Sequence, residues 1–146
     1  MEIERKFLVK ELPSLKNAPA SHIVQGYISL NPETRVRKRD EKYYLTIKGE
    51  GDIVRTEEER ELDPIEGENL FSQVKSHLVE KTRYIIDIGK HKAELDIYEG
   101  RLKGLIVVEV EFESVEDSKT FVAPSWFGED ISKNKEYRNK VLAFKP

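Results

Sequence analysis

Charged residues alternate with apolar residues along several short stretches of the chain, and this alternation is what most constrains the fold. Between residues 105 and 113, three glutamates alternate with two valines and a phenylalanine. Successive side chains of a β-strand point to opposite faces, so a period of two indicates a strand with one buried face. An amphipathic helix would instead place its apolar residues three and four positions apart. The pattern therefore favours a fold built from β-strands.

The same alternation recurs along most of the chain. It predicts strands over residues 2–9, 23–30, 34–39, 43–48, 53–62, 78–88, 92–98 and 105–113. Helical spacing predicts a helix over 64–77, and we expect shorter helices over 114–122 and 135–144, with a loop at 124–128. No linker or repeat divides the sequence, which predicts a single domain over residues 1–146. The predicted class is mainly β (α+β), a closed eight-stranded antiparallel β-barrel with a few flanking helices, because closure leaves no unpaired strand edge.

Charge is unusually abundant, and it is sorted by sign. Charged residues make up 36% of the sequence, whereas about 25% is ordinary. Glu2 and Glu4 share one strand face, and Arg35, Arg37 and Arg39 share another. For a single strand, exposure of such a face to water is the simplest interpretation. Like charges two residues apart repel each other, however, unless counter-charges or a metal ion offset the repulsion.

These one-signed faces suggest a second arrangement, in which they point into the barrel while helices cover its apolar outside. Buried charges are tolerated when they are paired or bind an ionic ligand. Carboxylates bind hard divalent cations such as Mg²⁺, and arginines present forked donors that match phosphate oxygens. A wet interior with both kinds of patch predicts a site for a metal–polyphosphate complex.

Several functional classes are excluded or disfavoured by what the sequence lacks. The absence of cysteine excludes disulfides, thiolate zinc sites and cysteine nucleophiles. No glycine-rich phosphate loop and no nucleophile elbow occurs. The net charge of -3 disfavours a basic nucleic-acid-binding domain. No apolar run approaches the roughly 18 residues of a membrane span, and the charged start lacks the apolar core of a signal peptide. We therefore expect a cytoplasmic protein without a nucleic-acid or membrane partner.

Short motifs in a fixed order connect the chain to a known family. They are Glu2-Ile3-Glu4-Arg5-Lys6, Arg35-Val36-Arg37, Leu45-Thr46-Ile47-Lys48, Arg55-Thr56-Glu57-Glu58-Glu59, Lys81-Thr82-Arg83-Tyr84, Glu94-Leu95-Asp96, Glu109-Val110-Glu111-Phe112 and Trp126-Phe127-Gly128-Glu129-Asp130. Together they cover nearly the whole chain. In these motifs the sequence resembles the CYTH superfamily, the triphosphate tunnel metalloenzymes. The resemblance implies a closed eight-stranded tunnel and divalent-metal-dependent action on triphosphates.

The resemblance also implies roles for the residues at matching positions. The metal ligands would be Glu2, Glu4 and one or both of Glu109 and Glu111, with Asp96 in the metal-side network. The substrate phosphates would be bound by Lys6, Arg35, Arg37, Arg39, Lys48, Lys81 and Arg83, with Lys135 as a further candidate. Catalysis would depend on Glu2, Glu4 and Lys6, and on Glu57 and Glu59 near a second metal or its water. The expected cofactor is Mg²⁺ or Mn²⁺, with two divalent ions bound alongside the substrate.

The sequence departs from the pattern of the family near its end. Many relatives carry a basic residue directly before the tyrosine that corresponds to Tyr137, whereas this chain has Glu136 there. Lys133 or Lys135 is the candidate to replace it. In addition, the acidic run over residues 57–61 allows the family's acidic pair to be assigned to positions 57 and 59 or to positions 59 and 61.

The expected reaction is metal-dependent hydrolysis of a triphosphate, with inorganic tripolyphosphate giving diphosphate and phosphate. Alternatives within the superfamily are a class IV-type adenylate cyclase, a thiamine triphosphatase and a nucleoside triphosphatase. The sequence shows no clear aromatic or amide pocket for a base, which favours a small substrate. A non-catalytic polyphosphate-binding module is a further alternative, although such a module would not need the paired carboxylates.

Overall fold

Ten strands form one sheet in the computed structural model, which describes residues 1–145. The strands are β1 (Glu2–Val9), β2 (Ala20–Leu30), β3 (Glu33–Arg39), β4 (Lys42–Lys48), β5 (Val54–Arg55), β6 (Glu57–Leu62), β7 (Leu78–Ile88), β8 (His91–Tyr98), β9 (Ile106–Glu111) and β10 (Phe127–Asp130). The helices are α1 (Pro64–Ser72), α2 (Val115–Thr120) and α3 (Asn139–Leu142), with 3₁₀ turns η1 (Gly100–Leu102) and η2 (Lys135–Tyr137). The expectation of a mainly β chain with a few helices is confirmed.

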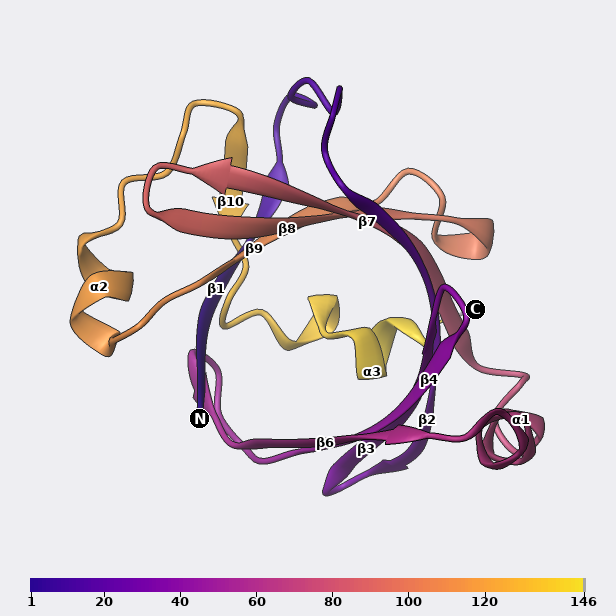
Figure 1. The fold of residues 1–146 in the computed structure, drawn as a ribbon. Helices are drawn as coiled ribbons and strands as arrows, with labels where there is room; N and C mark the ends of the chain where they lie inside the picture. Colours follow the sequence, from indigo (N-terminus) through magenta and orange to yellow (C-terminus); the bar gives the residue numbers. More distant parts are fainter. Residues whose placement is uncertain (146) are drawn as a thin grey trace.

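The strands pair antiparallel in the order β10-β1-β9-β8-β7-β2-β3-β4-β6, and the sheet curves around a central space (Figure 1). The expectation of a closed eight-stranded barrel is wrong for the hydrogen-bonded sheet, since β6 does not pair with β1. The two ends are linked instead by β5, where Glu2 faces Arg55 and Ile3 faces Val54. The strand predicted over 53–62 is interrupted at Thr56, so its first part pairs with β1 and its second part with β4.

Two of the helices begin where a side chain can cap them. Asp63 accepts a hydrogen bond from the Glu66 amide just before Pro64, and Ser114 accepts one from the Asp117 amide at the start of α2. Such caps satisfy amides that have no partner within the helix. Both helices are shorter than predicted, and part of the loop predicted at 124–128 belongs to β10. No helix of residues 1–145 is long and apolar enough to cross a membrane.

The C-terminal segment lies inside the ring rather than on its outer wall (Figure 1). The predicted helix over 135–144 is divided into η2 and α3, because Arg138 between them has an extended backbone with ψ of 138°. Leu142 and Ala143 pack in one buried cluster with Tyr98 and Val107. The end of the chain therefore fills part of the interior with apolar side chains.

Apolar residues also cover the outside of the sheet, in two further clusters. One of them packs Phe7, Ala93, Leu95, Val108, Val110, Phe112 and Phe127 together beside α2 and β10, and the other packs Val36, Tyr43, Leu62 and Val74 together beside α1. Helices α1 and α2 lie outside the ring (Figure 1). In these two clusters the apolar strand faces are turned outward and covered, which leaves the alternate, charged faces for the interior.

Candidate functional site

The inner face of the curved sheet encloses a polar cavity of about 220 Å³. Its acidic lining includes the predicted residues Glu2, Glu4, Glu57, Glu59, Glu109 and Glu111. Its basic lining includes the predicted residues Lys6, Arg35, Arg37, Arg39, Lys48 and Arg83. The structure therefore brings together twelve of the fifteen residues expected at the site and leaves out Lys81, Asp96 and Lys135. The charged faces point inward, as the second arrangement predicted.

The acidic side is formed where β1 and β9 pair. Glu4 faces Glu111 and Lys6 faces Glu109 in the register of these strands. Burial, reinforced by the charge of Glu109, raises the pKa of Glu4 to about 9. Burial opposes ionisation of Glu109 as well, but Lys6 and Lys48 outweigh it and lower the pKa of this carboxyl. The two carboxyl groups thus differ in protonation at neutral pH when no cation is bound.

The donor chemistry of this acidic side fits a divalent metal ion. Within residues 1–145, no lysine or arginine nitrogen lies within 4.0 Å of the carboxylates of Glu4, Glu109 or Glu111. Carboxylate oxygens without basic partners are the ligands that Mg²⁺ and Mn²⁺ take, although within residues 1–145 no three cavity carboxylates bring their oxygens within 4.8 Å of one another. A cation placed among them would also favour the ionised form of Glu4, against the burial and the charge of Glu109 that keep this carboxyl protonated. These residues, with Glu2 beside them, are the ones that could hold the metal.

The basic side is built on β3 and β4. The Lys48 Nζ lies 2.7 Å from Glu2 Oε1 and 3.5 Å from Glu57 Oε1, so this ammonium group lies between the carboxylates of β1 and β6. The Arg35 Nη2 lies 3.8 Å from Glu57 Oε1, and the buried Nε of Arg35 has no hydrogen-bond partner. Arg37 is held by an uncharged neighbour, since its Nε donates to Gln25 Oε1 at 2.9 Å. The arginines of β3 keep donor groups available for an anion.

Two further basic residues of the lining have partners of a different kind. The Arg39 guanidinium lies 4.8 Å from the centre of the Tyr44 ring and donates to the Tyr44 hydroxyl at 3.1 Å. The Lys6 Nζ donates to the Tyr137 carbonyl oxygen at 2.8 Å, and burial lowers the pKa of this ammonium group. Lys6 thus ties the cavity to the C-terminal segment.

Lys81 and Asp96 lie within the wall behind the cavity, together with Arg83. Asp96 accepts from Arg83 Nε at 2.8 Å and from Arg83 Nη2 at 2.9 Å, and the Lys81 Nζ lies 2.7 Å from Asp96 Oδ2. Burial alone would raise the pKa of Asp96, but Arg83 and Lys81 hold it well below its usual range. Burial lowers the pKa of Lys81 to about 7. Both Asp96 oxygens are occupied by cations, so this carboxylate supports Arg83 rather than facing the cavity.

The structure distinguishes between the two assignments of the acidic pair. Glu57 and Glu59 line the cavity, and Glu59 Oε2 accepts from the buried Thr46 hydroxyl at 2.9 Å. Glu61 is exposed and does not line the cavity. The assignment to positions 57 and 59 therefore matches the cavity.

The basic residue expected near the end of the chain is also at another position. Lys133 and Lys135 are exposed and do not line the cavity. Arg138 lines it instead, donating to the Gly51 carbonyl oxygen at 3.2 Å and forming an ion pair with Asp52. Arg138 follows Tyr137 in the chain rather than preceding it, which explains why the pattern of the family did not reveal it.

Two other lining residues, and one residue behind them, were also missed as site residues. Glu94 lines the cavity from β8, and its alternation with Asp96 was the available signal. Arg55 lines it from β5 and donates to Glu33 at 2.9 Å, a pairing between distant strands that no local pattern reveals. Gln25 is completely buried behind Arg37 and carries no charge, so nothing in the strand pattern marked it.

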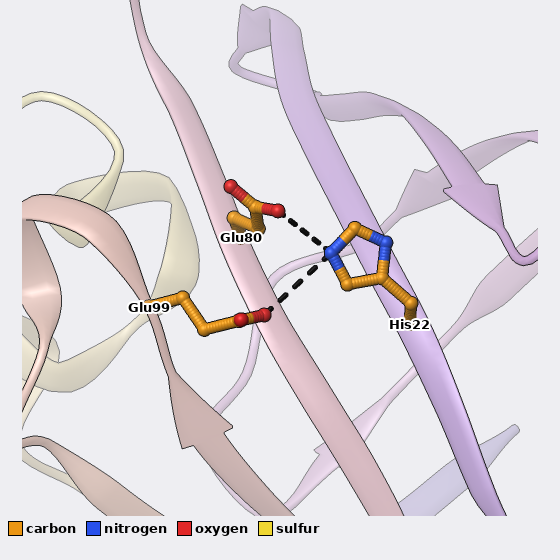
Figure 2. Close-up of side chains that lie close together, drawn as sticks. All are labelled: His22, Glu80 and Glu99. Carbon is orange, nitrogen blue, oxygen red and sulfur yellow. Dashed lines mark hydrogen bonds and ion pairs between the residues drawn. The ribbon is translucent and has the colours of Figure 1, made fainter.

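A separate group of possible metal ligands lies on the outer surface (Figure 2). The His22 Nε2 lies 2.7 Å from Glu80 Oε2 and 3.5 Å from Glu99 Oε2. The three side chains are 50%, 46% and 45% exposed. None of them lines the cavity. Contacts between exposed polar side chains account for this arrangement, and such surface contacts contribute little to stability.

Comparison with known proteins places the chain among characterised relatives. No family model matches the sequence. The inorganic triphosphatase of Nitrosomonas europaea is 39% identical over 97% of this chain and 96% of the relative. The inorganic triphosphatase of Acetivibrio thermocellus is 30% identical over 99% of this chain and 94% of the relative.

Solved structures agree with the sequence comparison. A crystal structure of an inorganic triphosphatase matches with a TM-score of 0.77 and 37% identity, covering 100% of this chain and 96% of that chain. A putative adenylyl cyclase from Hippeastrum, described as having a dominant triphosphatase activity, shares the fold with a TM-score of 0.54 and 16% identity over 82% of this chain and 83% of that chain. From its ordered motifs and its full-length relatives, the chain belongs to the inorganic triphosphatase family of the CYTH superfamily.

Proposed function

We propose that this protein hydrolyses inorganic tripolyphosphate to diphosphate and phosphate, with Mg²⁺ or Mn²⁺ bound in the cavity. The observation that carries the proposal is one polar cavity in which carboxylates without basic partners face arginines and lysines. The carboxylates match a divalent cation, and the basic groups match phosphate oxygens. The relatives at 39% and 30% identity, both inorganic triphosphatases, support the same reaction.

In this proposal Glu2, Glu4, Glu109 and Glu111 hold the cation. When bound, the cation neutralises phosphate charge and lowers the pKa of a coordinated water. Glu4 is protonated at neutral pH in the metal-free protein, so it must release its proton when it becomes a ligand. Metal binding is therefore expected to weaken as the pH falls.

The basic residues of the lining bind the triphosphate in this proposal. Arg35 and Arg37 present forked donors, and Lys6 and Lys48 add compact charges. Arg83 adds its charge at the cavity wall while its nitrogens donate to Asp96 and Glu94. These groups stabilise the negative charge that develops on the transferred phosphoryl group and on the leaving diphosphate. Because the donors are fixed by the strands before the substrate arrives, little reorganisation is needed during the reaction.

We assign Glu57 and Glu59 to the attacking water. Glu59 is fixed by the Thr46 hydroxyl, and Glu57 lies 3.5 Å from the ammonium group of Lys48. A fixed carboxylate at the cavity wall can accept a proton from water during an in-line attack on a terminal phosphorus. Lys81 and Asp96 act indirectly in this proposal, by holding Arg83.

The proposal includes a tunnel around the substrate. β5 joins the ends of the curved sheet through two residues paired with β1, and Arg55 and Arg138 connect the loop before β5 to neighbouring parts of the chain. We propose that these contacts complete the wall when substrate and metal are bound. The C-terminal segment inside the ring then restricts access at one end.

The size and polarity of the cavity favour an inorganic substrate over a nucleotide. Its volume of about 220 Å³ is below the roughly 300–1,000 Å³ of pockets that enclose drug-sized ligands. The aromatic residues in its lining are Tyr27 and Tyr137, and the Tyr27 hydroxyl already accepts a hydrogen bond from Gln25. A purine would find no open stacking surface among these groups.

The proposal is tested by incubating the purified protein with tripolyphosphate, ATP or thiamine triphosphate in Mg²⁺, Mn²⁺, Ca²⁺ or EDTA. We expect phosphate and diphosphate from tripolyphosphate with Mg²⁺ or Mn²⁺, and none in EDTA. Release of cyclic AMP and diphosphate from ATP as the main reaction would assign a cyclase instead. Tight, metal-independent binding of tripolyphosphate without phosphate release would assign a binding module.

A further inference from the structure

Gln25 is completely buried in β2, directly behind the cavity, and both ends of its amide are hydrogen-bonded. Its Oε1 accepts from Arg37 Nε at 2.9 Å, and its Nε2 donates to the Tyr27 hydroxyl at 2.8 Å. The guanidinium of Arg37 has donors only, so the amide oxygen must be the atom that faces it. The orientation of the amide is thereby fixed by its partners.

The strand register holds this contact in place. Gln25 faces Arg37 directly across the β2–β3 pair, and Tyr27 faces Arg35 two residues further along. Side chains directly opposite each other in an antiparallel pair share one face of the sheet. The backbone thus places the amide beside Nε and leaves both terminal nitrogens of Arg37 without a protein hydrogen bond in residues 1–145.

Arg37 differs in this respect from Arg83, Lys81 and Lys48, whereas Lys6 is likewise bound to a neutral acceptor, the Tyr137 carbonyl oxygen. Arg83 and Lys81 are bound to the carboxylate of Asp96, and Lys48 is bound to the carboxylate of Glu2. The nitrogens of Arg37 have no carboxylate oxygen within 4.0 Å among the described residues. Its guanidinium is oriented by a neutral group, so its charge is not cancelled locally.

We propose that Gln25 is a positioning residue, which aims the free end of Arg37 at the substrate phosphates while leaving the charge of Arg37 uncompensated. The inference rests on the proposed function. Burial, and then the nearby charges of Arg35 and Arg83, lower the pKa of Arg37 to about 9, so the surroundings of this guanidinium disfavour its charged form. A polyanion bound at its free end would favour the charged form again.

The chemistry of glutamine explains why no other residue serves equally well. Glutamate has the same shape and accepts from Nε, but its charge would pair with Arg37 and compete with phosphate for it. Methionine has a similar length but accepts poorly, so it would leave the buried Nε and the Tyr27 hydroxyl without a partner. A neutral acceptor is the option that fixes Arg37 without weakening its attraction for an anion.

The experiment compares Gln25→Glu with Gln25→Met. A purely structural role and the proposed role predict opposite answers to the question of which variant binds substrate less well. A structural role makes Gln25→Met the worse variant, since it removes two buried hydrogen bonds. The proposed role makes Gln25→Glu the worse variant for substrate, although its melting temperature is at least that of Gln25→Met. We expect KM for tripolyphosphate to rise about tenfold or more in Gln25→Glu and about threefold in Gln25→Met, with kcat changed less than KM in both.

Calorimetric titration of tripolyphosphate in EDTA supplies a second readout that does not depend on turnover. Gln25→Glu should lose affinity by a factor similar to its rise in KM. Ser118→Ala is the matched control, because Ser118 is buried, hydrogen-bonded and absent from the cavity lining. Its KM and affinity should equal those of the wild type.

Equal affinity of Gln25→Glu and the wild type would overturn the inference, and so would a larger loss in a folded Gln25→Met. If Gln25→Met fails to fold, the comparison of Gln25→Glu with the wild type still decides the question. A wild-type protein that neither binds nor hydrolyses tripolyphosphate would overturn the proposed function itself. Hydrolysis by the wild type with no effect in Gln25→Glu would overturn only the role of Gln25.

Discussion

At the scale of single residues, Glu4 links the proposed metal site to stability. Its raised pKa of about 9, against an ordinary value of 4.5, means that the folded protein retains a proton that the unfolded chain has lost over this range. The metal-free fold should therefore lose stability as the pH rises from about 5 to 9. Glu4→Gln removes this titration, so the melting temperature in EDTA should depend less on pH in the variant.

The same substitution should abolish most of the activity. A neutral amide is a weaker ligand than a carboxylate, and we expect tripolyphosphate hydrolysis in Mg²⁺ to fall by about 100-fold or more. Mg²⁺ should also raise the melting temperature of the wild type more than that of the variant. Phosphate release and thermal melts check both statements. Full activity of Glu4→Gln at saturating Mg²⁺ would remove Glu4 from the ligand set.

Asp96 is the residue whose loss should damage the fold most directly. Asp96→Asn would leave the completely buried Lys81 without an anionic partner. It would also leave Arg83 with Glu94 as its remaining carboxylate. We expect a loss of about 3–5 kcal/mol in the free energy of unfolding, measured by urea denaturation at neutral pH. Since the pKa of Asp96 is lowered, its contribution is present above an ordinary value of 3.8 and is lost as the pH falls further, where variant and wild type should converge.

A matched control is the exposed pair of Arg5 and Asp130, which are 21% and 40% exposed and lie 2.9 Å apart. Asp130→Asn should cost less than about 1 kcal/mol, because solvent screens surface ion pairs. Equal losses in Asp96→Asn and Asp130→Asn would contradict the supporting role assigned to the buried cluster.

At the scale of elements, the strands were predictable and their ends were not. A period of two identifies a strand with one buried face from its own residues, so the alternation of glutamate with valine was enough to assign β9 its charged face. The division at Thr56 depends on which neighbour each half of the segment meets, and that is not local information. The same holds for the C-terminal segment, where an extended Arg138 reaches Gly51 instead of continuing a helix.

The contact between the segment before β5 and the C-terminal segment can be tested by substituting Arg138. Arg138→Gln would lose the ion pair with Asp52 and weaken the bond to the Gly51 carbonyl oxygen, which together hold the segment before β5 against the C-terminal segment. We expect faster hydrogen exchange over residues 49–55 and a KM for tripolyphosphate raised about threefold or more. Lys135→Gln is the control, since the exposed Lys135 lies outside the cavity. Equal effects of the two substitutions would contradict the assignment of Arg138.

At the scale of the whole molecule, the site exists because charged strand faces point to the inside of the curved sheet and apolar faces point outward. Apolar strand faces pack outward under α1 and α2, and the charges that a conventional barrel would expose converge on one cavity. Alternation predicted the two faces but could not say which one was enclosed, because that depends on long-range closure. The ordered motifs supplied this missing information, since they identify the family rather than the local geometry. Neither the alternation nor the motifs identified uncharged residues, such as Gln25, that hold a charged residue of the site in place.

The weakest seam of the ring should lie where β5 meets β1. β5 contributes two residues to this pairing, whereas β7 and β8 pair along eight positions. A short seam opens at lower free energy than a long one, so amides of β5 should exchange with solvent much faster than those of β8 in the metal-free protein.

Tripolyphosphate and Ca²⁺, added together, should slow exchange at β5 most, because Glu2 and Arg55 line the cavity on the two sides of the seam. Hydrogen exchange followed by mass spectrometry measures both differences. Protection at β5 equal to that at β8 without ligand would show that the ring is already closed, and unchanged exchange at β5 with ligand would show that substrate does not complete the tunnel.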